Sequence, residues 1–182
     1  GHQAAAEAAE KKAAAIIVSQ EVELPKQSGT TLIRVEDTRY ALAFVSAAWF
    51  DHPAKKLTTI GITGTKGKTT TTYLVKSILE NAGRKVGLVG TIEIIIGDTH
   101  IHAVNTTPES YLLQEYFAKM VESGCDTVVM EVSSQALMLH RTQGFVFDFG
   151  IFTNLEPDHI GPNEHGSFEE YAHCKSLLFQ QY

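Results

Sequence analysis

The stretch TIGITGTKGKTTTT, residues 59–72, decides the fold of this chain. Its first part is an apolar strand, and its last part opens a helix after two glycines, Gly64 and Gly67. In such a turn the backbone N–H groups point at phosphate oxygens, a lysine adds charge for the β- and γ-phosphates, and a hydroxyl can bind Mg²⁺. The sequence therefore predicts a triphosphate site in which Lys68 holds phosphate and Thr69 holds the metal.

One position departs from the usual phosphate-loop pattern. The pattern G-x-x-x-x-G-K-[ST] would place its first glycine where this chain has Ile62, so Gly64 must supply the bend. An ordinary strand-to-helix turn with a solvated lysine is the alternative. The apolar strand before the turn and the amphipathic run after it favour nucleotide binding. The predicted nucleotide-binding residues are Gly64, Thr65, Lys66, Gly67, Lys68, Thr69 and Thr70.

The amino-acid composition limits the class of protein, its partners and its compartment. The chain has 182 residues, 43% hydrophobic and 20% charged, as in an ordinary globular protein that can bury a core. Its net charge of −6 gives no general attraction for nucleic acid or anionic membrane, so neither is an expected partner. Two cysteines without metal-ligand spacing fit a reducing compartment, and we find no stretch that would span a bilayer. We expect a cytoplasmic protein, and a monomer.

The N-terminal part reads as a fraction of a small α/β domain, residues 1–56. The pattern predicts a helix over residues 3–14, strands at 15–19 and 31–35, and a helix from Thr38, which would cap it, to about Phe50. Residues 51–56, DHPAKK, read as a linker. A second domain is expected over residues 57–182.

In that second part, strands alternate with helices. Strands are expected from Leu57, at 86–89, at 127–132 and at 149–153, with a hairpin around Gly97-Asp98 and helices to about Glu80, over 108–122 and over 168–179. Thr106 or Thr107 would cap the second of these helices. The apolar strands are typical of a buried, mostly parallel sheet flanked by helices, the phosphate-loop type of α/β fold.

In such folds, ligands lie beyond the carboxyl ends of the strands. Glu131 leaves its strand there, and its carboxylate can hold Mg²⁺, although a salt-bridged or capping glutamate is the alternative. His159 ends the run that follows another strand and could ligate metal or be a hydrogen-bonded surface group. Lys175 and Arg141, taken alone, would be a solvated lysine and a helix-terminal charge.

Four groups of residues together resemble the Mur ligase family of peptidoglycan precursor synthesis, and within it the MurE group, which adds the third peptide residue. They are TGTKGKTTT at 63–71, NTTPE at 105–109, EVSSQALMLHR at 131–141, and TNLEPDH at 153–159 with YAHCKSLLF at 171–179. The resemblance covers most of the chain. It implies a ligase that uses ATP to phosphorylate a carboxylate, after which the amino group of a free amino acid attacks the acyl phosphate.

The resemblance also implies a role for each candidate residue. Lys68 would contact the γ-phosphate, and Thr69 and Glu131 the first Mg²⁺. His159 would hold a second Mg²⁺ together with Lys175, the latter as a carbamate formed with CO₂. The carbamate turns a cation that would repel Mg²⁺ into an anionic ligand. The catalytic residues implied are Lys68, Glu131, His159 and Lys175, although the segment GPNEHG, residues 161–166, looks like an insertion before Lys175.

The implied substrate is the UDP-N-acetylmuramoyl dipeptide, UDP-N-acetylmuramoyl-L-alanyl-D-glutamate. Its contacts would be Thr106, Thr107, Ser133 and Arg141, whose planar guanidinium suits a carboxylate. Full ligases of this family have three domains, so the chain is expected to be a fragment that lacks the C-terminal domain. The added amino acid stays open between lysine, diaminopimelate and another residue.

Two other functions stay open at this point. One is a phosphate-loop nucleotide-binding or switch module that carries out no ligation. The other is a ligase like folylpolyglutamate synthase, which usually shows Gly-Lys-Gly-Ser where this chain has Gly67-Lys68-Thr69-Thr70, and which lacks the EVSSQAL run. Nucleotide turnover that depends on the muramoyl dipeptide would exclude the switch, whereas folate binding would favour the second alternative.

Overall fold

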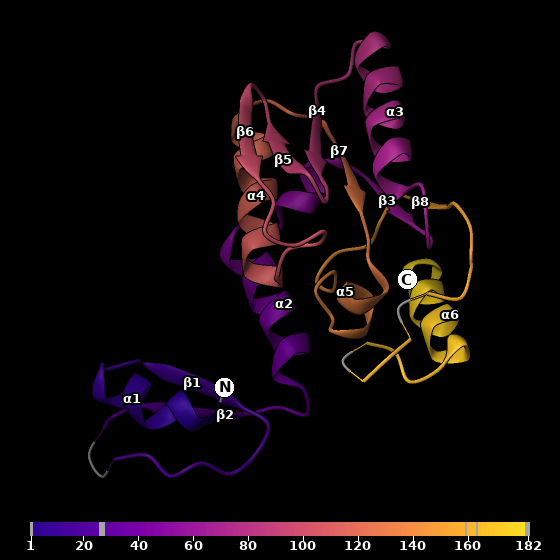
Figure 1. Ribbon diagram of the computed structural model, residues 1–182. Coiled ribbons are helices and arrows are strands. Elements are labelled where there is room, and N and C mark those ends of the chain that lie inside the picture. The colour runs from indigo at the N-terminus through magenta and orange to yellow at the C-terminus, as the bar shows by residue number, and fades with distance from the viewer. Residues whose placement is uncertain (1, 26–27, 159, 163, 181–182) are drawn as a thin grey trace. The chain divides into compact units, whose positions relative to one another are not determined.

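The computed structural model describes residues 2–25, 28–158, 160–162 and 164–180. The chain packs as two compact units, Gly1–Leu42 and Ala43–Tyr182 (Figure 1). The division falls inside helix α2 (Thr38–Trp49), and the domain boundary expected at residue 56 stays a prediction.

The first unit is a small α/β element. A 3₁₀ turn, η1 (His2–Ala4), leads into helix α1 (Ala5–Glu10), and strands β1 (Ala15–Val18) and β2 (Thr31–Arg34) pair in parallel. The helix is shorter than predicted because the backbone turns at Lys12, whose φ is 61°. The cap of α2 is Asp37 rather than Thr38, since its carboxylate accepts from the N–H groups of Arg39 and Tyr40.

A six-stranded sheet forms the centre of the second unit. Its order is β6-β5-β4-β7-β3-β8, and β4, β7, β3 and β8 run parallel. The strands are β3 (Thr58–Thr63), β4 (Val86–Val89), β5 (Glu93–Ile96), β6 (Thr99–His102), β7 (Thr127–Glu131) and β8 (Phe149–Phe152). The predicted hairpin is confirmed as β5 and β6, with Gly97 at φ 56° in the turn. The mostly parallel α/β sheet is likewise confirmed.

Helices cover both faces of this sheet (Figure 1). Side chains alternate along β7, so that Val129 packs with Ile60 and Ile62 toward helix α3, while Val128 and Met130 pack toward α4. Leu178 joins the core on the α4 face. The helical elements are α3 (Lys68–Asn81), α4 (Ser110–Glu122), α5 (Ser134–Met138), α6 (Phe168–Ser176) and the 3₁₀ turn η3 (Leu177–Phe179).

Residues 51–56, predicted as a linker, contain the 3₁₀ helix η2 (Pro53–Lys56), in which Pro53 and Ala54 are buried. One local prediction in this unit is wrong. Strand β8 is not buried: it pairs only with β3 among the described strands, and Phe149 is 59% exposed. An all-apolar strand pattern fits a central strand, but it does not tell which strand stands at the edge of the sheet.

Candidate functional site

The phosphate loop lies at the carboxyl end of β3 and opens α3. Two glycines shape it, with φ angles of 143° at Gly64 and 82° at Gly67, a region that favours glycine. Gly67 is the residue that caps α3, so the N–H groups of the first helical turn face the same side as the loop. The predicted bend at Gly64 is confirmed, and this geometry suits an anion.

Lys68 lies across this loop. Its Nζ donates to the carbonyl oxygens of Gly64 at 2.9 Å and Thr65 at 3.0 Å. Burial lowers the pKa of Lys68, and the carboxylates of Glu131 and Asp158 oppose that effect. The ammonium group is therefore held at the loop, within reach of an anion bound by the N–H groups at the start of α3.

Glu131 is the last residue of β7 and is almost fully buried. Its Oε2 accepts from the Thr69 hydroxyl at 3.0 Å, and its Oε1 accepts from the backbone N–H of Thr91 at 2.9 Å. The Thr91 hydroxyl also donates to Oε2 at 3.0 Å, with the Thr106 hydroxyl 3.1 Å beyond it. These are hard oxygen ligands of the kind Mg²⁺ prefers, so Thr69 and Glu131 fit the metal that the sequence suggested.

Lys175 belongs to α6 and is only 2% exposed. Its Nζ donates to the Gly64 carbonyl at 2.8 Å, the same oxygen that Lys68 contacts, and lies 4.5 Å from the centre of the Tyr171 ring. Burial, and then the charge of Lys68, lowers the pKa of Lys175 from its ordinary 10.5 to about 8. The interpretation as a solvated lysine is wrong, because α6 turns this side chain inward to the phosphate loop.

A cavity of about 480 Å³ opens beside the two lysines. It brings together residues from six separate stretches of the sequence, including all four predicted substrate contacts. The lining residues are Lys68, Asn105, Thr106, Thr107, Ser133, Ser134, Gln135, Arg141, Glu164, His165 and Lys175. A ligand in this cavity would lie against both the phosphate loop and the predicted substrate residues.

Thr107 and Arg141 form one wall of this cavity. The Thr107 hydroxyl donates to the Glu131 carbonyl at 2.9 Å and accepts from the Ser133 N–H at 3.1 Å. It therefore does not cap α4, whose capping position is Glu109. Arg141 donates to the Thr107 carbonyl at 3.1 Å and pairs with Glu109 at 2.7 Å, so the guanidinium is fixed and not a free helix-terminal charge.

Several residues of the site carried no signal in the sequence. Thr91 follows the Gly90 turn after β4, and only the pairing of β4 with β7 brings it to Glu131. Tyr171 donates to the Thr65 hydroxyl at 3.1 Å, and buried His165 shares a 2.8 Å hydrogen bond with Ser134. An aromatic residue on the inner face of α6 looks like ordinary core. His159 lies outside the described residues.

Among the described residues, no three or more His, Cys, Asp or Glu side chains form a metal-binding group. The donors brought together here are Thr69 and Glu131, and Mg²⁺ commonly takes one or two carboxylates and completes its shell with water and phosphate. We found no helix in the described ranges that is long and apolar enough to cross a membrane.

A phosphate loop, a buried carboxylate and a cavity with a fixed arginine are the features of a nucleotide-dependent enzyme, and sequence comparison gives the family. Residues 62–182 match the model of the Mur ligase middle domain. The chain belongs to the Mur ligase family, and the resemblance of its four groups of residues is confirmed.

Curated proteins similar to this chain include ligases that carry one common name. The chain is 48% identical over 181 residues to the UDP-N-acetylmuramoyl-L-alanyl-D-glutamate--2,6-diaminopimelate ligase of Clostridium perfringens, covering 100% of the chain and 37% of that protein. It is 48% identical to the ligase of the same name from Bacillus licheniformis, covering 36% of it. The chain thus spans little more than a third of the length of these relatives.

Solved structures agree on the fold. A structure of UDP-N-acetylmuramoyl-L-alanyl-D-glutamate--2,6-diaminopimelate ligase matches 97% of this chain and 35% of its own, with a TM-score of 0.80 and 26% identity. A structure of UDP-N-acetylmuramoylalanyl-D-glutamyl-2,6-diaminopimelate--D-alanyl-D-alanyl ligase from Acinetobacter baumannii matches 91% of this chain and 32% of its own, with a TM-score of 0.54 at 18% identity, which supports the fold alone.

Proposed function

We propose that this chain is the nucleotide- and substrate-binding part of an ADP-forming ligase that joins 2,6-diaminopimelate to UDP-N-acetylmuramoyl-L-alanyl-D-glutamate. One observation carries the proposal: a single cavity is lined by Lys68 and Lys175 together with Thr106, Thr107, Ser133 and Arg141. The names of the relatives support the choice of substrates. ATP use also supports a cytoplasmic location, and the monomeric state stays a prediction.

In this proposal the cavity residues hold the carboxylate substrate. Arg141, fixed by Glu109 and by the Thr107 carbonyl, offers a planar guanidinium edge to a carboxylate, and Thr106 and Ser133 add hydroxyl groups. Holding the substrate carboxylate beside the phosphate loop converts an encounter of two molecules into a reaction within one complex. The cavity and the loop share Lys68, so both reactants lie within reach of one cation.

The loop residues hold the nucleotide. ATP supplies the phosphoryl group that converts the carboxylate into an acyl phosphate; the amino group of the incoming amino acid then displaces phosphate, loses a proton and forms the amide. Lys68 would hold the γ-phosphate oxygens through its ammonium group, and the N–H groups of Gly67 and the first turn of α3 would hold the phosphates. Thr69 and Glu131 would hold Mg²⁺, which offsets phosphate charge.

Lys175 has a separate part in the proposal, as a carbamate. The two lysine amines converge on the Gly64 carbonyl, an arrangement in which two positive charges repel each other. Reaction of the Lys175 amine with CO₂ forms an N–C bond, releases one proton and leaves an anionic oxygen pair. The repulsion by Lys68 then becomes attraction, and Lys175 together with His159 could ligate a second Mg²⁺.

The test is ADP formation by the complete ligase that contains this chain. The reaction contains ATP, Mg²⁺ and UDP-N-acetylmuramoyl-L-alanyl-D-glutamate, with 2,6-diaminopimelate or lysine in parallel. Turnover that requires both substrates, prefers 2,6-diaminopimelate and falls on the order of 1,000-fold in Lys68→Ala is expected, since the lysine stabilises transferring phosphate. Lys119→Ala, which removes an exposed lysine of α4 paired with Glu115, is the matched control and should keep full activity.

Other outcomes point to the remaining functions. ATP hydrolysis that ignores the muramoyl dipeptide would indicate a nucleotide-binding module that does not ligate. Turnover with a folate substrate in place of the muramoyl dipeptide would indicate a ligase like folylpolyglutamate synthase. Preference for lysine over 2,6-diaminopimelate would leave the ligase in place and change the amino acid.

A further inference from the structure

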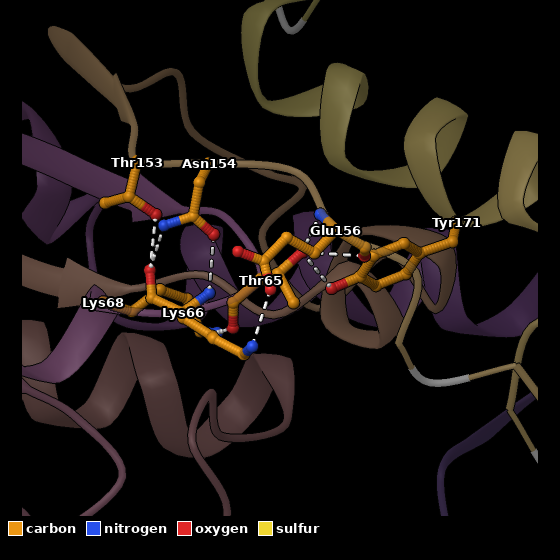
Figure 2. A network of polar contacts seen from close by, with 7 residues as sticks. All are labelled: Thr65, Lys66, Lys68, Thr153, Asn154, Glu156 and Tyr171. Atoms are coloured by element: carbon orange, nitrogen blue, oxygen red, sulfur yellow. Dashed lines mark hydrogen bonds and ion pairs between the residues drawn. The ribbon is translucent and has the colours of Figure 1, made fainter.

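The segment that leaves β8 lies against the phosphate loop, although the two are far apart in the sequence. Figure 2 shows Thr153, Asn154 and Glu156 directed at Thr65 and Lys66 of the loop. The hydrogen bonds between Asn154 and Lys66 join residues 88 positions apart. None of the substrate or metal roles described above involves Thr153, Asn154 or Glu156.

Asn154 binds the loop through both its side chain and its backbone. The Asn154 Oδ1 accepts from the Lys66 N–H at 2.9 Å, and its Nδ2 donates to the Lys66 carbonyl at 3.0 Å. Its own carbonyl accepts from the Thr65 N–H at 2.9 Å. The side-chain amide thus satisfies both polar groups of one loop residue, as a neighbouring strand would, and fixes the orientation of the flanking peptide groups.

Thr153 binds the same Lys66 carbonyl as the Asn154 side chain. Its hydroxyl donates to the Lys66 carbonyl at 2.8 Å, and the Thr63 carbonyl lies 3.3 Å away. A Cβ added to Gly64 would lie 1.9 Å from this hydroxyl oxygen. Gly64 and Thr153 therefore form a matched pair, in which a glycine is needed partly because the threonine hydroxyl occupies the adjacent space.

These contacts divide the loop into two functional parts. The N–H groups of Thr65 and Lys66 are already bound to Asn154, so they are turned toward β8 and not toward a phosphate. The anion-binding N–H groups must then come from Gly67 and the first turn of α3. A loop with two glycines at positive φ has many accessible conformations, and the contacts from Thr153 and Asn154 select one of them.

We propose that Thr153 and Asn154 are positioning residues that hold loop residues 64–67 in the phosphate-binding conformation before the nucleotide arrives. The proposal rests on the proposed function, because it takes the loop's ligand to be Mg·ATP. Thr153 and Asn154 would act by holding the loop, without contacting substrate, metal or nucleotide themselves. Without these two residues the loop must be ordered during binding, which weakens affinity for the nucleotide.

The experiment measures Mg·ATP binding to the complete ligase that contains this chain by titration calorimetry. Asn154→Ala deletes two hydrogen bonds to the loop and should raise the Kd about 10-fold or more. Thr153→Val removes the hydroxyl at nearly constant volume and should raise the Kd roughly 3-fold to 10-fold, whereas Thr153→Ser keeps the hydroxyl and should restore wild-type affinity. Asn81→Ala, which removes an exposed asparagine at the far end of α3, is the matched control and should leave the Kd unchanged.

A second measurement separates positioning from general stability. Hydrogen–deuterium exchange of the nucleotide-free complete ligase should be faster at residues 65–67 in Asn154→Ala and in Thr153→Val, and unchanged in β3 and β7. An unchanged Kd together with unchanged exchange in Asn154→Ala would overturn the proposal. Equal Kd values for Thr153→Val and Thr153→Ser would do the same, even if Asn154→Ala fails to fold. Absence of Mg·ATP binding by the wild-type complete ligase would instead overturn the nucleotide part of the proposed function.

Discussion

The carboxyl ends of β7 and β8 contribute to the same site in opposite ways. Strand β7 lies in the middle of the sheet, is buried along its whole length, and ends in Glu131, whose carboxylate accepts hydrogen bonds from Thr69 and Thr91. Strand β8 is exposed, yet the residues that follow it bind the phosphate loop through at least as many hydrogen bonds. The burial of a strand therefore does not determine how many hydrogen bonds the residues at its carboxyl end contribute to the site.

The largest expected loss in the free energy of unfolding comes from a substitution in the buried strand β7. Met130→Ala in β7 removes a fully buried side chain that packs in the α4 face of the core. It should lower the free energy of unfolding by about 3 kcal/mol, from lost burial and the cavity left behind. Urea unfolding followed by circular dichroism measures this, and a loss below roughly 1 kcal/mol would show that the core closes around the gap.

A smaller loss in the free energy of unfolding is expected where Thr153, which follows β8, contacts Gly64 of the phosphate loop. Gly64→Ala forces a side chain into a φ of 143° and against the Thr153 hydroxyl, so it should lower the free energy of unfolding by roughly 2 kcal/mol. Gly67→Ala is the matched control, since its φ is 82° but no atom lies within 4 Å of the added Cβ. Urea unfolding should place Gly67→Ala nearer to wild type. Equal losses in the two variants would mean that backbone strain alone, and not the Thr153 contact, determines the result.

The smallest effect is expected on the exposed strand itself. Phe149→Ala removes a side chain that is 59% exposed, so the free energy of unfolding should fall by less than about 1 kcal/mol. The same urea experiment applies. A loss as large as that of Met130→Ala would contradict the contrast between the two strands.

The sequence predicts the phosphate loop itself better than it predicts which distant segments lie beside the loop. The strand, the two glycines and the start of α3 follow from local pattern, as do Lys68 and Thr69, because a phosphate loop is short and contiguous. The exposure of β8 does not follow, since strand order depends on pairing between distant segments. For the same reason, nothing in the sequence around Thr91 indicates that its hydroxyl meets Glu131.

The hydrogen-bond partners of two side chains in the site could not be predicted from the neighbouring sequence either. Thr107 stands before a helix, where a hydroxyl usually caps, but its hydroxyl binds the backbone of the segment after β7 instead. Lys175 is a charged residue on a helix, which predicts exposure, and only the docking of α6 buries it at the Gly64 carbonyl. The family resemblance, and not the residue pattern, indicated that this lysine belongs to the site.

The separation in sequence between the loop and its partners affects how the protein folds. The contact between Gly64 and Lys175 spans 111 residues, and that between Lys66 and Asn154 spans 88. A growing chain exposes the loop long before the segments that order it have been synthesised. Contacts of such long range slow folding, because the connecting chain must be closed before they form. The nucleotide site is therefore completed only after β8 and α6 have been synthesised and have packed against the loop.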